Sequence, residues 1–235
     1  MSRPLVFVGY DSREDLAYEV CRASLLAHCP DAEVVALRKD NLRLIHGRAA
    51  FVRDDQAYDA LDLKPFSTEF SFSRFLSPLL ARWMDRDRCI FVDSDFLFRD
   101  DVGELWELPL KHAVHVVQHN YHPPAGHKMR GQVAQQEYSR KLWSALMLFD
   151  VPRVTLTPYQ INVMPGAYLH GFGWVSGDVG RLPESWHWVP GHSPMGLEPR
   201  AVHYTEGTPD VPGYDDQPYA EEWLRYAAAV GRVAA

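Results

Sequence analysis

The sequence predicts an α/β fold with a mixed, mostly parallel central sheet that is flanked by helices. Its opening is the first observation: an apolar run at 5–9 is followed by a helical repeat of apolar residues and then by a second apolar run at 34–37. Two parallel strands joined by a helical crossover have this order. The second observation is a series of further strand-length apolar runs, at 89–92, 96–98, 113–117, 142–150 and 200–204.

Length and composition are those of an ordinary globular protein. The chain has 235 residues, of which 46% are hydrophobic and 23% charged. Its net charge of −7 argues against a nucleic-acid partner, because such proteins usually carry a basic surface. No apolar stretch approaches the roughly 18 residues of a membrane helix, and no secretory signal is visible. We therefore expect a soluble cytoplasmic protein without an integral membrane segment.

The first strand ends at Gly9 and is followed by Tyr10 and Asp11. In α/β sheets, ligands collect at the carboxyl ends of the strands, so these two residues are expected at a binding edge. Asp11 is interpreted either as a helix cap or as a ligand-binding residue. Ser12 and Asp15 resemble a capping box for the helix that follows.

The next segment, 38–70, is mixed and polar and predicts a long irregular connection. From Ser71 onward the spacing predicts a helix that Pro78 should distort or restart. Arg74 lies beside the apolar face of this helix. It is either a surface charge or a cation that reaches a bound diphosphate or the acidic motif described next.

Two carboxylates follow the apolar run at 89–92 in the sequence Asp93-Ser94-Asp95. Side chains alternate along a strand, so both acids should share one edge, where like charges repel unless a cation lies between them. Oxygen ligands of this kind suit a hard divalent ion that bridges to phosphate. The alternative is a solvated acidic turn. After it, Asp100 and Asp101 should cap a short helix at 102–106.

The second half of the chain offers candidates for the rest of a site. The polar stretch 118–136 is interpreted as a loop over the site or a surface excursion, and the histidines between 112 and 127 lack the spacing of a metal centre. Asp150 ends the 142–150 run and either faces an acceptor or forms a turn. The 182–188 segment is either core packing or a sugar platform. The three cysteines are expected to be reduced and buried, and a helix should start near Pro218.

The chain resembles the GT-A fold glycosyltransferases, and most closely those of family 8, which use nucleotide sugars. Four stretches carry the resemblance in order: VFVGYDSREDLAYEVCRASLLAHC, FSFSRFLSPLLARWMDRDRCIFVDSDFLFRDDVGELWEL, GRLPESWHWV and AVHYTEGTPD. The second is the strongest, because it joins an arginine helix to an Asp-x-Asp strand. The resemblance implies one Rossmann-like domain over 1–235, with a donor-binding half at 1–110 and an acceptor-side half at 111–235 that closes with a C-terminal helix.

The resemblance also implies an activity and its residues. It implies a retaining transfer of a sugar from a nucleoside-diphosphate sugar, usually UDP-linked, to an unknown glycan, lipid-linked, protein or small-molecule acceptor. Asp93, Asp95 and His203 would coordinate Mn²⁺ or Mg²⁺. Donor contacts would come from Val8, Gly9, Tyr10, Asp11, Arg74, Asp93, Ser94 and Asp95.

The acceptor side departs from the family pattern. The family's Asn-Ala-Gly motif is replaced near Ser144-Ala145-Leu146, and a phosphate-binding lysine is missing at Thr208-Pro209-Asp210. Candidates for an acceptor-activating or catalytic residue are Asp150, Asp178 and His170. Two other functions stay open: a nucleotide-sugar-binding relative without turnover, and a sugar-phosphate nucleotidyltransferase. The latter normally has a glycine-rich basic loop after the first strand, which GYDSRED is not.

Overall fold

The computed structural model describes residues 3–120, 127–128, 133–134 and 140–233. Six strands form the central sheet in the order β12-β8-β11-β6-β1-β2. Only β11 runs antiparallel to its neighbours β6 and β8, and the other neighbouring pairs are parallel. The predicted mixed, mostly parallel sheet is therefore confirmed. The strands are β1 (Leu5–Gly9), β2 (Glu33–Leu37), β6 (Arg88–Val92), β8 (Val114–Val116), β11 (Leu146–Asp150) and β12 (Gly180–Arg181).

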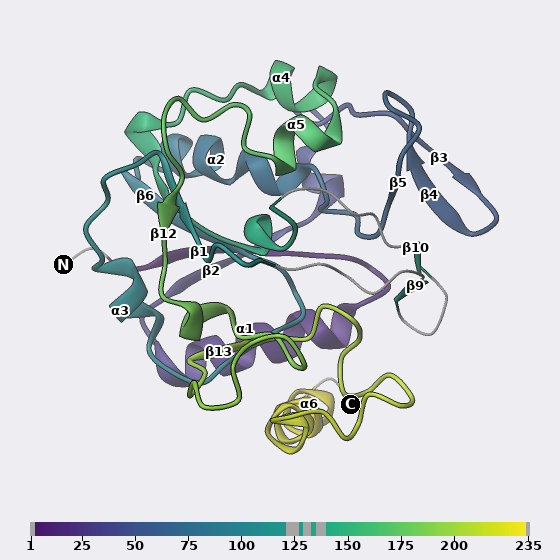
Figure 1. Ribbon diagram of the computed structural model, residues 1–235, viewed down its shortest axis with the longest axis vertical. Helices are drawn as coiled ribbons and strands as arrows, with labels where there is room; N and C mark the ends of the chain where they lie inside the picture. The colour runs from purple at the N-terminus through teal and green to yellow at the C-terminus, as the bar shows by residue number, and fades with distance from the viewer. Residues whose placement is uncertain (1–2, 121–126, 129–132, 135–139, 234–235) are drawn as a thin grey trace.

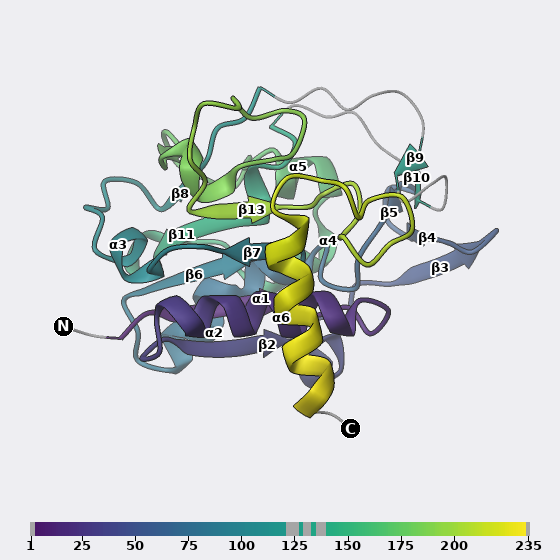
Figure 2. The same ribbon diagram turned by 90° about the horizontal axis from the view of Figure 1, so that it is seen from below.

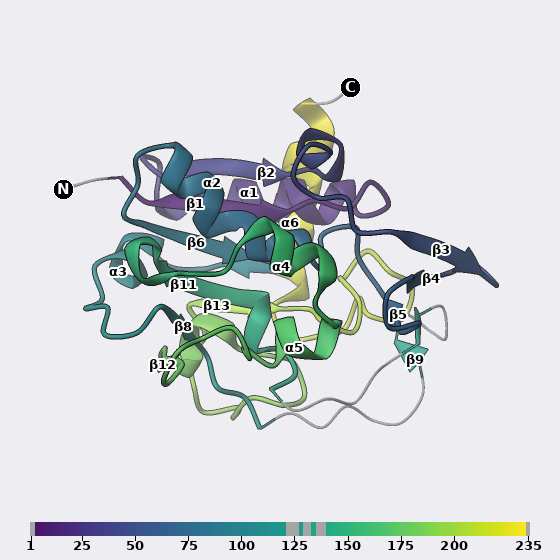
Figure 3. The same cartoon turned by 90° about the horizontal axis from the view of Figure 1, so that it is seen from above.

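Helices cover both faces of this sheet. Figure 1 shows α2 (Ser77–Trp83), α4 (Pro158–Val163) and α5 (Gly166–His170) on one side, and Figure 3 shows the same layer from above. On the other side α6 (Ala220–Val233) crosses α1 (Asp15–His28), as Figure 2 shows. The short helix α3 (Val102–Trp106) lies near the edge, and Asp101 caps it as predicted, by accepting a hydrogen bond from the Gly103 amide. Among the described residues no helix is both long enough and apolar enough to cross a membrane.

The core explains why the apolar runs became strands. Every residue of β1 is buried, and the main cluster of buried side chains extends from Leu5 to Ala201. A second buried cluster lies outside the main sheet. It packs around β7 (Phe96–Phe98) and β13 (Ala201–His203), which pair antiparallel, and it includes Trp188 and Trp223. The strand that follows the acidic motif therefore leaves the main sheet to pair with a segment from the end of the chain.

Several local predictions meet the structure directly. The helix restarts at Pro78 as expected, because Pro78 lies in the first turn of α2, which directly follows the 3-10 helix η2 (Ser73–Leu76). In the aromatic segment around η5 (Glu184–His187), Trp186 and Trp188 are each 2% exposed, so this segment packs in the core and is no sugar platform. The capping box predicted at Ser12 is wrong, because Glu14 is the N-cap residue of α1 and no side chain caps that end.

The connection at 38–70 is not irregular, and that prediction is wrong. It contains η1 (Lys39–Leu42) and a three-stranded sheet of β3 (Ala50–Arg53), β4 (Gln56–Asp59) and β5 (Pro65–Phe66), which projects from the body in Figure 3. A buried ion pair anchors this small sheet: Arg48 lies 2.7 Å from Asp59. Arg48 also donates to the carbonyls of Ile161 and Met164 at the C-terminal end of α4.

The remaining elements are short. They are β9 (His127–Lys128), β10 (Val133–Ala134), η3 (Trp143–Ala145) and η4 (Val151–Arg153). Most of the polar stretch predicted at 118–136, with the side chains of His122 and His127, lies outside the described residues. All three cysteines are free and buried, as expected.

Candidate functional site

The acidic motif forms the turn between β6 and β7, at the carboxyl end of β6. Backbone hydrogen bonds hold it on both sides. The Asp93 amide donates to the carbonyl of Ala145 at 2.9 Å, and the Tyr204 amide donates to the carbonyl of Asp95 at 3.0 Å. The turn is thus fixed between segments that are distant in the sequence.

His203 joins the two carboxylates through the pairing of β13 with β7. It lies opposite Phe96 in the register, next to Asp95. Its Nε2 is 3.1 Å from Asp95 Oδ1. One ligand atom from each of Asp93, Asp95 and His203 lies within 4.8 Å of the others. Two carboxylate oxygens and an imidazole nitrogen form a donor set that suits a divalent cation such as Mn²⁺ or Mg²⁺.

Arg74 contacts the acidic motif and is not a surface charge. Its NH1 lies 2.8 Å from Asp93 Oδ1 and donates to the carbonyl of Ser144 at 3.0 Å. The residue is only 6% exposed, so its positive charge acts at short range on Asp93. Ser94, the middle residue of the motif, is buried, and its hydroxyl lies 3.5 Å from the Glu14 carboxylate.

A cavity of about 640 Å³ opens beside this cluster. Its walls come from the segment around β5, from η3, from the start of α5 and from the acidic motif with β13. Three cationic side chains, Lys64, Arg74 and Lys141, line it together with the metal-binding candidates. The other lining residues include Glu14, Asp62, Phe66, Ser67, Thr68, Phe70, Ser71, Phe72, Ser144, Gly166, His170 and Thr205.

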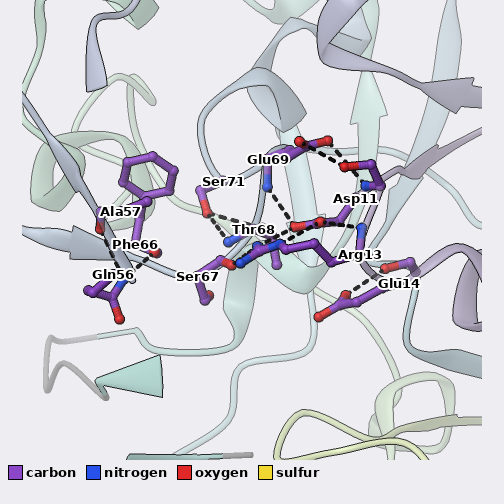
Figure 4. Close-up of polar contacts among 12 residues, drawn as sticks. Asp11, Arg13, Glu14, Gln56, Ala57, Phe66, Ser67, Thr68, Glu69 and Ser71 are labelled. Carbon is purple, nitrogen blue, oxygen red and sulfur yellow. Dashed lines mark hydrogen bonds and ion pairs between the residues drawn. The ribbon is translucent and has the colours of Figure 1, made fainter. Parts of the chain in front are cut away.

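Asp11 does not cap α1 but accepts a set of hydrogen bonds that join neighbouring segments. Arg13 donates to both of its carboxylate oxygens, and the Glu69 amide donates to Oδ2 (Figure 4). Arg13 also donates to the carbonyl of Ser67, and Ser12 donates to the Glu69 carboxylate. Burial would raise the pKa of Asp11, but the hydrogen bonds from Arg13 and Glu69 hold it below its usual value. This network fastens one wall of the cavity to the end of β1.

The predicted donor-binding stretch 8–11 does not itself line the cavity. Val8 is fully buried in the sheet, and Tyr10 stacks against the Arg38 guanidinium, which lies 3.5 Å from its ring centre. The ring of Phe70 covers Gly9: a Cβ atom at that position would lie 2.5 Å from Phe70 Cδ2. The residue that approaches the Gly9 backbone is therefore Phe70.

Of the three acceptor-side candidates, the cavity contains only His170. Asp150 pairs with Arg88 at the start of β6, whereas Asp93 follows the end of that strand. The expectation that Asp150 faces the acceptor is therefore wrong, because β11 runs antiparallel and places its last residue at the opposite edge. Asp150 instead binds Arg153. Asp178 is exposed and does not line the cavity.

His170 is tied to the cavity wall. Its Nδ1 lies 2.8 Å from the Ser144 hydroxyl, and its ring packs edge-on against Phe75. Burial, followed by the positive charge of Arg74, lowers the pKa of His170 to about 3. The imidazole is therefore neutral at neutral pH and fixed in orientation.

Sequence reasoning missed three contributors to this region. Lys64 and Lys141 carry no local signal, because only the tertiary fold brings them to the cavity. Lys141 lies between Arg140 and Leu142, which both adopt left-handed backbone angles, with φ of 65° and 69°. His187 lies within the GRLPESWHWV stretch, and its Nε2 is 2.7 Å from His203 Nδ1.

Comparison with known proteins identifies the family. Protein CDI of Arabidopsis thaliana is 37% identical over 230 residues, which cover 93% of this chain and 84% of that protein. The chain belongs to the Protein CDI family. No model of an established protein family matches it.

Solved structures show which fold this member of the Protein CDI family has. The glycosyltransferase GlyE of Streptococcus pneumoniae TIGR4 superimposes with a TM-score of 0.61 at 15% identity, over 97% of this chain and 60% of GlyE. An active-site mutant of LgtC gives a TM-score of 0.58 at 12% identity, over 96% and 95% of the two chains. The galactosyltransferase LgtC in complex with donor and acceptor sugar analogues gives 0.53 at 12% identity. The GT-A fold expected from the sequence is therefore confirmed.

Proposed function

We propose that this protein is a metal-dependent glycosyltransferase that moves a sugar from a nucleoside-diphosphate sugar to an acceptor. UDP is the first nucleotide to test. The observation that carries the proposal is the cluster of Asp93, Asp95 and His203 at the wall of a large cavity in a GT-A fold. The cavity has room for a sugar and part of an acceptor, since small-molecule sites commonly measure about 300–1,000 Å³.

Each residue of the cluster has a role in the proposed reaction. Asp93, Asp95 and His203 would hold the divalent cation, and Arg74 would limit the repulsion between Asp93 and the incoming diphosphate. When bound, such a cation supplies Lewis-acid stabilisation of the negative charge that builds on the departing nucleoside diphosphate. Lys64 and Lys141 add positive charge at the cavity wall. The lysine that the family usually has is missing at Thr208-Pro209-Asp210.

The acceptor side favours retention of stereochemistry. An inverting enzyme needs a base aimed at the acceptor hydroxyl. Asp150 and Asp178 lie away from the cavity, and the Asp62 carboxylate already accepts hydrogen bonds from the amides of Lys64 and Gly166. Glu14 and His170 also line the cavity, but the Glu14 carboxylate lies 3.5 Å from the Ser94 hydroxyl, and a pKa lowered to about 3 makes His170 a weak base. In a retaining reaction the departing phosphate itself accepts the acceptor's proton, so no such base is required.

Thermal unfolding with a panel of nucleoside diphosphates, each with Mn²⁺ or with a chelator, tests the proposal. A ligand at a concentration of about 100 times its Kd stabilises the native state by about 2.7 kcal/mol. We expect UDP or another nucleoside diphosphate to raise the Tm only when Mn²⁺ is present. The absence of metal-dependent stabilisation by every nucleotide in the panel would overturn the proposal.

Turnover separates an enzyme from a binding protein. We expect slow hydrolysis of the preferred nucleotide sugar, which should disappear in Asp95→Ala. Intact binding with no hydrolysis and no transfer to a broad acceptor panel would instead support a nucleotide-sugar-binding role.

A further inference from the structure

A hydrogen bond between two buried histidines lies directly behind the metal-binding candidates. His187 Nε2 is 2.7 Å from His203 Nδ1, and the two residues are 0% and 1% exposed. Both rings pack against Phe96, with ring centres 5.1 and 4.4 Å away. The His203 amide donates to the carbonyl of Trp188 at 2.8 Å, so the backbone also fixes the two segments against each other.

An imidazole pair of this kind has two proton arrangements, because a neutral imidazole donates through one nitrogen and accepts through the other. In the first, His187 Nε2–H donates to His203 Nδ1, and the proton on His203 Nε2 faces Asp95 Oδ1 at 3.1 Å. In the second, His203 Nδ1–H donates to His187 Nε2, and His203 Nε2 presents a lone pair to the carboxylates. A metal ligand must offer a lone pair, so only the second arrangement allows His203 to bind a cation.

We propose that His187 is a positioning residue for the metal site: it donates to His203 in the metal-free protein and accepts from His203 when a divalent cation is bound. The inference rests on the proposed function, since it requires that Asp93, Asp95 and His203 hold such a cation. Both rings stay neutral in the exchange. One proton crosses from His187 Nε2 to His203 Nδ1. His203 Nε2 loses its proton and His187 Nδ1 gains one, so the pair releases none overall.

The surroundings of His187 allow this exchange. Its ring is fully buried and packs against the rings of Phe96 and His203. Its Nδ1 has no hydrogen-bond partner among the residues that the structure describes. The His119 ring packs edge-to-face against it, with centres 4.4 Å apart. Neither proton arrangement is therefore favoured by a hydrogen bond to His187 Nδ1 from the described residues, so binding of the cation can select the second arrangement.

Two substitutions separate the hydrogen bond from simple packing. His187→Leu keeps the site filled but removes both donor and acceptor. His187→Gln restores them, because its side-chain amide offers an oxygen acceptor and a nitrogen donor at the same number of bonds from Cβ as Nε2. His112→Leu is the matched control, since His112 precedes β8 and does not line the cavity.

The binding of Mn²⁺ to the full chain, measured by electron paramagnetic resonance, is the first readout. Loss of a hydrogen-bond partner behind a metal ligand typically weakens metal binding by about 10–100-fold. We expect a weakening of that size in His187→Leu, near wild-type affinity in His187→Gln and no change in His112→Leu. Equal Mn²⁺ affinity in wild type and His187→Leu overturns the inference. A wild-type protein that binds neither Mn²⁺ nor Mg²⁺ overturns the proposed function itself.

Histidine proton–nitrogen correlation spectra of the wild-type protein test the same point without any variant. On addition of Mg²⁺, which is diamagnetic, we expect the protons of both His203 and His187 to move from Nε2 to Nδ1. A His187 ring that keeps the same protonated nitrogen while Mg²⁺ binds overturns the inference, whether or not His187→Leu folds.

Discussion

At the scale of single residues, Gly9 shows how closely the cavity wall packs on the end of β1. Its missing side chain leaves the space that the Phe70 ring fills. We expect Gly9→Ala to lower the free energy of unfolding by about 1–3 kcal/mol, the usual cost of overpacking a buried site. Urea unfolding measures this. Gly196→Ala is the control, because a Cβ atom there would meet nothing within 4 Å. Equal losses in the two variants would contradict the close-packing explanation.

Asp95 is the residue on which the proposed metal site depends most directly, because it faces both Asp93 and His203. Asp95→Asn preserves its shape and removes its charge. We expect Mn²⁺ affinity to fall by at least the roughly 10–100-fold that the loss of an outer-shell partner costs. Calorimetric titration with Mn²⁺ measures the change. Asp150→Asn is the matched control and should bind Mn²⁺ as the wild type does, since Asp150 lies at the opposite edge of the sheet.

At the scale of elements, the small sheet β3-β4-β5 depends on one buried ion pair. The side chains of Arg48 and Asp59 are 2% and 1% exposed, and Arg48 also binds two carbonyls beside α4. Removal of one partner leaves a buried charge, which typically costs about 3–5 kcal/mol. We expect a loss of that size in Arg48→Met, measured by chemical unfolding. Arg43→Met should change stability little, because its pair with Asp40 is exposed, and a similar loss there would argue against burial as the cause.

The same elements show what local sequence patterns can and cannot predict. Apolar spacing predicts strands at 5–9 and 89–92, proline chemistry predicts a helix that restarts at Pro78, and a side-chain acceptor predicts the α3 cap. All are confirmed. The direction of β11 has no such signal, because the same apolar run suits a parallel or an antiparallel neighbour. Asp150 was therefore expected at the wrong edge. The sheet at 50–66 was missed because a long-range ion pair and the packing on α4 stabilise it.

The residues of the candidate site also fall into those that the sequence predicts and those that it does not. Asp93, Asp95 and His203 were predicted as one group, and the structure brings them together. The two aspartates follow a predicted strand and are expected together from the residues alone. His203 joins the group only through the family resemblance, because the pairing of β13 with β7 has no local signal. Lys64 and Lys141 belong to connections whose course depends on the tertiary fold, and no spacing rule locates them.

At the scale of the whole molecule, several half-buried histidines predict how stability depends on pH. Burial lowers the pKa of His46 and of His119 to about 4, and that of His170 to about 3, below the ordinary 6.5. At a pH between the lowered pKa of each histidine and 6.5, the unfolded chain binds protons that the folded chain does not. The free energy of unfolding should therefore fall as the pH falls below 6.5, by up to about 1.4 kcal/mol per pH unit for each histidine.

Urea unfolding at about pH 7 and about pH 5 measures this dependence. His46→Leu is the informative variant, because neither ring nitrogen of His46 has a hydrogen-bond partner among the described residues. The variant should lose stability less steeply on acidification than the wild type. An unchanged slope would show that His46 is protonated in the folded protein.

The pairing of β13 with β7 sets when the proposed metal site can form during synthesis. Asp93 and Asp95 leave the ribosome together, but His203 follows only after every strand of the main sheet has been made. Because domains tend to fold from the N-terminus as they emerge, a nascent chain that already has its sheet still has only two of the three proposed ligands. Stable capture of a cation would therefore mark a chain synthesised past residue 203, and a translation product that stops short of residue 201 should fail to retain the ion.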